Sequence, residues 1–73
     1  MNKYVVIYER SATGWGAYVP DLPGLGVVGS TLEETRQLIR DGIGFHIEDL
    51  RSGGNQVPPP STLFEEVEVN IHG

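Results

Sequence analysis

The 73-residue chain contains no cysteine, only five Lys and Arg residues, and no long hydrophobic run. The lack of cysteine excludes a disulfide framework and a thiolate metal site. Ten Asp and Glu residues give a net charge of -5, so the chain lacks the surplus of cations that neutralises phosphates in nucleic-acid binding. We therefore expect no direct nucleic-acid contact. A surplus of acid suits a basic partner, and it also serves solubility.

The shortage of apolar sequence excludes a membrane span. The longest apolar run covers residues 4–8, whereas a spanning helix needs about 20 residues. The N-terminus has one Lys and no apolar signal core, so we expect a cytoplasmic protein. A chain of this length forms about one domain, here residues 1–73, and buries only about 60% of its unfolded surface. Oligomerisation is the common remedy for such marginal stability.

Three short segments at the N-terminal end have the composition of β-strands. Residues 3–9 are β-branched and aromatic, a turn follows at Ser11–Gly14, and residues 15–19 continue as a second strand. Two prolines and Gly24 end that strand, and Gly26–Gly29 forms a short third strand. The order predicts an antiparallel meander.

The clearest local signal is the start of a helix at Ser30-Thr31-Leu32-Glu33-Glu34. Two overlapping capping boxes occur there, Ser30 with Glu33 and Thr31 with Glu34. Apolar residues then recur at helical spacing until Ser52-Gly53-Gly54 stops the helix. Gly42 and Gly44 lie inside this pattern and each costs about 1 kcal/mol relative to Ala. We expect close packing of the helix on the sheet at one of them.

The last third of the chain predicts a connector and a fourth strand. Residues 56–61 are rich in proline and read as an extended spacer. Residues 64–71 alternate, with Val67, Val69 and Ile71 on one face and acids on the other. The fold class is therefore α+β with the order β-β-β-α-β. A three-stranded antiparallel meander is joined by a fourth strand, which is parallel to the first in the simplest arrangement, and one helix packs on one sheet face.

One helix covers only one face of a sheet, yet both faces of the first two strands carry apolar side chains. An uncovered apolar face marks a contact surface. We therefore expect a homo-oligomer, a dimer or higher, with Tyr4, Val6, Tyr8 and Tyr18 at its interface.

No constellation of residues predicts catalysis, a metal site or a cofactor. His46 lies beside the apolar stripe of the helix and reads as a partly buried ring, and His72 is next to the C-terminus. An enzyme related to RNase H would need acids gathered at strand ends to bind Mg²⁺. Glu9, Asp21 and Glu66 are the only candidates, and their spacing gives no support. We expect a protein that is not an enzyme.

The combination of three segments resembles the HicB antitoxin family. These segments are Tyr18-Val19-Pro20-Asp21-Leu22-Pro23-Gly24, then Gly29-Ser30-Thr31-Leu32-Glu33-Glu34, and the proline run Val57–Pro60. The likeness covers residues 4–61 and extends to related single-domain HicB-like proteins. The chain departs from the family pattern at Leu25, where Cys is usual, at Ser30, where Asp is usual, and at Thr35 and Gly42, where Ala is frequent.

The resemblance implies a partial RNase-H-like fold without the metal-binding acids of a nuclease. It also implies a partner, a small basic ribonuclease toxin of the HicA type, which the antitoxin masks by occlusion. Full-length members usually carry a C-terminal DNA-binding domain, and we expect this chain to lack one. An acidic antitoxin facing a basic toxin agrees with the charge of the chain.

Two regions are candidates for the partner contact. One is the loop of Asp21, Leu22 and Pro23, and the other is the helix start with Glu33 and Glu34, because both offer acids or apolar groups beside an edge strand. For Glu33 and Glu34, capping of the helix is the simpler interpretation. The alternative function is a homo-oligomeric HicB-like binding protein that has no toxin partner.

Overall fold

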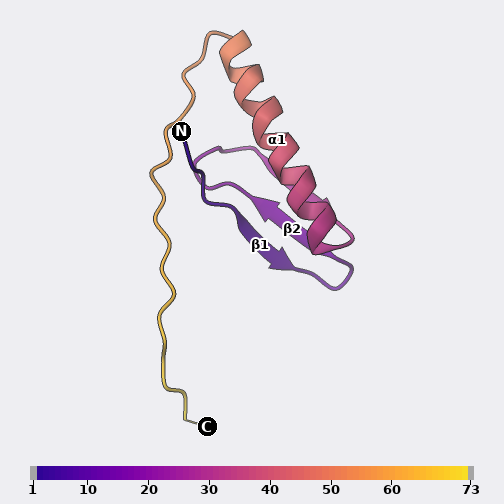
Figure 1. Ribbon diagram of the computed structural model, residues 1–73, viewed down its shortest axis with the longest axis vertical. Helices are drawn as coiled ribbons and strands as arrows, with labels where there is room; N and C mark the ends of the chain where they lie inside the picture. The colour runs from indigo at the N-terminus through magenta and orange to yellow at the C-terminus, as the bar shows by residue number, and fades with distance from the viewer. Residues whose placement is uncertain (1, 73) are drawn as a thin grey trace.

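Three strands form an antiparallel meander in the computed structural model, which describes residues 2–72 (Figure 1). The strands are β1 (Ile7–Arg10), β2 (Trp15–Tyr18) and β3 (Gly26–Gly29), in the order β1-β2-β3. The hairpin closes where the Ser11 N–H donates to the Gly14 carbonyl at 2.8 Å. Arg10 stacks over the ring of its ladder partner Trp15, 4.9 Å from the ring centroid. The predicted meander is confirmed.

The single helix, α1 (Leu32–Ser52), is capped at both ends. Thr31 is the N-cap, and its Oγ1 accepts a hydrogen bond from the Glu34 N–H at 3.1 Å. The Glu34 carboxylate accepts one from the Ser30 N–H at 3.3 Å. Thr31 rather than Ser30 therefore caps the helix, and the Glu34 side chain completes a variant of the capping box by reaching the N–H one residue before the cap.

The helix ends in a Schellman motif built on two glycines. Gly54 has a φ of 73°, a left-handed conformation that glycine adopts without strain. The Asn55 N–H donates to the Leu50 carbonyl at 2.9 Å, and the Gly54 N–H donates to the Arg51 carbonyl at 3.0 Å. The predicted stop after Ser52 is confirmed.

The core lies between α1 and one face of the sheet. Its buried apolar residues are Ala17, Val19, Leu22 and Ile39. Gly42 lets the helix approach the sheet, because a Cβ there would lie 3.1 Å from Leu25 Cδ1. A Cβ on Gly44 would meet nothing within 4 Å. The expectation of close helix-on-sheet packing at one of the two glycines is confirmed for Gly42.

The expected fourth strand does not form within this single chain. Residues 56–72 are extended but pair with no strand among the residues described, and beyond residue 64 the chain leaves the body of the domain (Figure 1). The α+β class is confirmed, with three strands and one helix. The alternation of side chains reports which face of a strand is apolar, whereas strand formation also requires a neighbouring edge to supply hydrogen bonds.

Candidate protein-binding surfaces

Asp21 lies in the loop after β2 and binds the segment that follows the proline run. Its carboxylate accepts hydrogen bonds from the N–H groups of Ser61 and Thr62 at 2.9 and 3.0 Å, and from their hydroxyls at 3.0 and 2.8 Å. Nearby, the Tyr4 hydroxyl donates to the Pro58 carbonyl at 2.6 Å. The loop residue Asp21 therefore fixes the path of the chain 40 residues later.

The hydrogen bonds to Asp21 stabilise its charged form. The Thr62 N–H, then the Ser61 N–H and the Thr62 hydroxyl, lower the pKa of Asp21 from 3.8 to about 2. Because the pKa in the folded state is below that in the unfolded state, the contact stabilises the fold fully above about pH 4. Its contribution is lost as the pH falls through about 2.

The rest of the loop divides into a buried and an exposed part. Leu22 is fully buried in the core, so its side chain is not available to a partner in this conformation. Pro23 is exposed at the tip. The loop closes through the Leu22 N–H to the Val19 carbonyl at 3.0 Å, and Gly24 has a φ of 88°. Of the predicted loop contacts, only Pro23 presents its side chain freely.

Glu33 and Glu34 lie at the other end of β3. Both side chains are exposed in the first turn of α1, and Glu34 also closes the helix cap. Because the 21–23 loop precedes β3 and the helix start follows it, the structure does not bring the two predicted regions together. Beside Glu34 lies a hollow of about 360 Å³ bounded by the β1–β2 turn and the end of β3.

The four residues predicted for an oligomer interface lie on two different faces. Tyr4, Val6 and Tyr8 are half-buried against the core, on the face that the helix covers. Tyr18 is 43% exposed and lies opposite Ile7 in the ladder, on the face that the helix leaves open. The sequence indicates which residues share a face, and the structure adds which face is covered.

The open face of the sheet has an apolar and hollowed surface. Val28 is 80% exposed, and its ladder partner Gly16 has no side chain beside it. Gly26 likewise lies opposite Tyr18. Together with Glu9, these residues border a shallow hollow of about 340 Å³.

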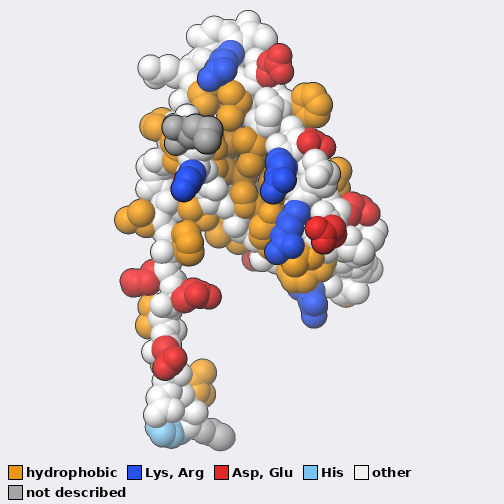
Figure 2. Space-filling view, viewed as in Figure 1, with side chains coloured by type: hydrophobic (Ala, Val, Ile, Leu, Met, Phe, Trp, Pro, Cys, Tyr) orange, Lys and Arg blue, Asp and Glu red, His pale blue; other side chains and the backbone are white. Residues whose placement is uncertain are grey.

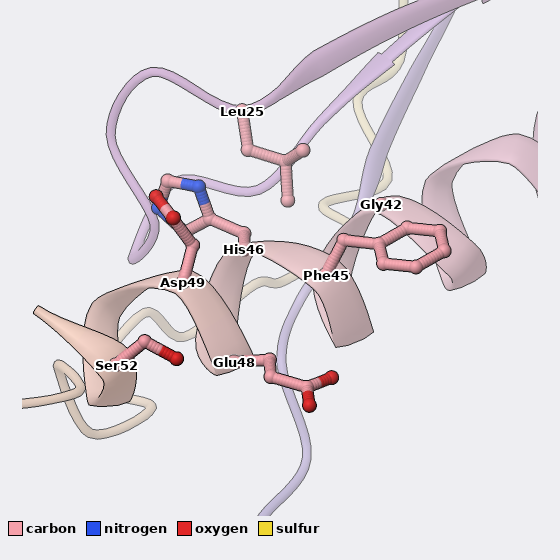
Figure 3. Close-up of a pocket in the computed structure, with 7 residues that line it drawn as sticks. All are labelled: Leu25, Gly42, Phe45, His46, Glu48, Asp49 and Ser52. Carbon is pink, nitrogen blue, oxygen red and sulfur yellow. The ribbon is translucent and has the colours of Figure 1, made fainter.

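A larger hollow, of about 640 Å³, runs along the C-terminal half of α1 (Figure 3). Phe45 is 73% exposed there, and His46 is half-buried. The lining residues are Leu25, Gly42, Phe45, His46, Glu48, Asp49 and Ser52. Within the described part of the chain, no three His, Asp or Glu side chains are grouped so as to hold a metal ion.

Comparison with known proteins assigns the family. Residues 4–71 match the model of the HicB-like antitoxins of bacterial toxin–antitoxin systems. An uncharacterised 14.9 kDa protein from the rep-hol intergenic region of Haemophilus phage HP1 (strain HP1c1) is 33% identical over 64 residues. This match covers 88% of the present chain and 48% of the phage protein, so the chain spans about half the length of that relative.

The chain therefore belongs to the HicB-like antitoxin family, as its sequence motifs indicate. The family match extends beyond residue 61, where the resemblance in sequence ends, and includes the extended segment that follows. No helix between residues 2 and 72 has the length and hydrophobicity to cross a membrane.

Proposed function

We propose that this protein binds a small basic ribonuclease toxin of the HicA type and masks it by occlusion, without catalysis of its own. The observation that carries the proposal is the family match over residues 4–71. The net charge of -5 supports it, because complementary charge accelerates encounter with a basic protein and disfavours wrong partners. The loss of toxin activity would follow from covering its RNA-binding surface.

The exposed start of α1 is the surface that best fits a basic partner. Glu33 and Glu34 are adjacent and exposed, and Glu34 borders the hollow between the β1–β2 turn and β3. The outer edge of β3 has no strand paired with it among residues 2–72, so its backbone groups are open to a partner segment. We propose Glu33 as the main charge contact, because the Glu34 carboxylate already accepts a bond from the Ser30 N–H.

The proposal is tested by binding the purified chain to a small basic toxin of the HicA type, chosen from an adjacent reading frame where one encodes such a protein. We expect a stable complex at low salt that weakens as salt rises, since exposed charge contacts are screened. Glu33→Lys weakens the complex, whereas Glu48→Lys, the same charge change at an exposed position further along α1, leaves it intact. Failure of the wild-type pair to associate at low salt contradicts the proposal, and equal effects of both variants contradict the assigned surface.

A further inference from the structure

The tail, residues 63–71, has the side-chain pattern of a strand but no strand beside it. Leu63 and Ile71 are 94% and 86% exposed, and Val67 and Val69 on the same side are exposed as well. The opposite side carries Glu66, Glu68 and Asn70, so the alternation is strict from Glu66 to Ile71, whereas Phe64 and Glu65 at the base of the tail do not follow it. Alternation of this kind is typical of a strand with one buried face. In this chain that face lies in water.

The base of the tail is held firmly, although the tail itself is free. The Asp21 carboxylate holds residues 61 and 62 through four hydrogen bonds, and Tyr4 holds Pro58. From there the tail runs away from the body of the domain (Figure 1). The molecule including the tail measures 53 Å along its longest axis. The exit point and direction of the tail are thus set by contacts within the chain.

The sheet lacks a neighbouring strand at its β1 edge, just as the tail lacks a strand beside it. In the described chain β1 pairs only with β2, so its outer edge has no neighbour. A hollow of about 480 Å³ lies between residues 3–7 and residues 62–64 at this edge. Unpaired edges are templates for an added strand.

We propose that the tail of each molecule forms the fourth strand of a second copy by pairing with the outer edge of its β1 segment, which is residues 3–10, that is β1 together with the four residues that precede it. Each chain supplies a free β1 edge and a free tail, so two copies can satisfy both by a reciprocal, two-fold exchange. The lengths agree: at about 3.3 Å per residue, the tail spans about 30 Å and residues 3–10 span about 26 Å.

The charges of the two segments also agree with this pairing. The tail carries Glu65, Glu66 and Glu68 and no base, and Figure 2 shows its acidic side chains apart from the Lys and Arg residues, which lie on the body. The β1 segment carries Lys3 and Arg10 against Glu9, a net positive charge. The β1 segment of a second copy therefore offers both an unpaired hydrogen-bonding edge and a charge complementary to that of the tail.

The oligomeric state of the toxin-free chain tests the exchange, independently of the proposed toxin. Light scattering over a dilution series should give a dimer of twice the 8.0 kDa chain mass. Val69→Glu places a charge on the apolar side of the tail and should give a monomer, whereas Asn70→Glu adds the same side chain to the polar side and should remain a dimer. A monomeric wild type, or equal behaviour of the two variants, overturns the proposal.

Cross-linking identifies what the tail pairs with, because a chain without cysteine accepts single thiols cleanly. Glu9→Cys chains and Glu66→Cys chains of different tag length are mixed, dissociated, reassociated and treated with a flexible bismaleimide. We expect a mixed cross-linked dimer of one chain of each kind. Links between two Glu66→Cys chains alone would mean that tails pair with each other, and would overturn the assignment to the β1 edge.

Discussion

Replacing Gly44 by alanine should stabilise the protein. Gly44 is exposed in the interior of α1, and a Cβ there would meet nothing within 4 Å, so alanine fits without strain. Glycine inside a helix is about 1 kcal/mol less favourable than alanine. For a domain of this size, a change of 1 kcal/mol shifts the Tm by about 4–8 °C. We therefore expect Gly44→Ala to raise the Tm by about that amount.

Gly42→Ala is the matched control, because it brings the same gain in helix propensity at a crowded position. Its Cβ would lie 3.1 Å from Leu25 Cδ1 and 3.8 Å from Val27 Cγ1, so Leu25 must shift to make room. We expect a smaller increase in Tm than for Gly44→Ala, or a decrease. Thermal unfolding is followed by helical circular dichroism and by the fluorescence of Trp15, at equal protein concentration. A larger increase for Gly42→Ala would refute the packing described for α1.

Two further predictions concern single hydrogen-bonding side chains. In the wild type, the amide signals of Ser61 and Thr62 should change as the pH falls through about 2, because protonation makes the Asp21 carboxyl a weaker acceptor. Asp21→Asn should lack that transition in NMR spectra, and an identical transition in both proteins would assign the titration to another group. Thr31→Ala removes the N-cap and should cost about 1 kcal/mol, a decrease in Tm of about 4–8 °C. Ser30→Ala should change the Tm little, and a reversed order would place the cap at Ser30.

The helix and the meander are predictable from sequence because their signals are local. The capping residue Thr31 and the stop after Ser52 lie within a few positions of the backbone groups that they satisfy. The sequence leaves Thr31 and Ser30 as equal candidates for the cap. Only the backbone geometry, with Thr31 extended and its Oγ1 on the Glu34 N–H, distinguishes them.

The contacts that organise the candidate surfaces are not local, and for that reason sequence reasoning missed them. Asp21 reads as a loop acid, yet its partners are 40 residues away. Leu22 is predicted from sequence as a partner contact in this loop, yet its side chain is fully buried in the core with Ile39. The alternation of the tail is evident in sequence, whereas the missing neighbour becomes evident only when the edges of the sheet are known.

The covered face of the sheet illustrates the same limit. Tyr4, Val6 and Tyr8 share a face by their spacing, which sequence alone provides. The ladder places Tyr8 beside Ala17, and Ala17 is in the core beneath α1. Tyr4, Val6 and Tyr8 are therefore partly buried against the core of the same chain, whereas Tyr18 is exposed on the open face.

The central claim, that this chain is the toxin-masking component of a toxin–antitoxin pair, is tested most directly by RNA cleavage. The small basic HicA-type toxin used in the binding test is assayed on RNA while this chain is added stepwise. The account predicts that cleavage stops near one antitoxin chain per toxin, and that Glu33→Lys shifts this titration to higher concentration while Glu48→Lys does not. Undiminished cleavage in the presence of excess wild-type chain would contradict it.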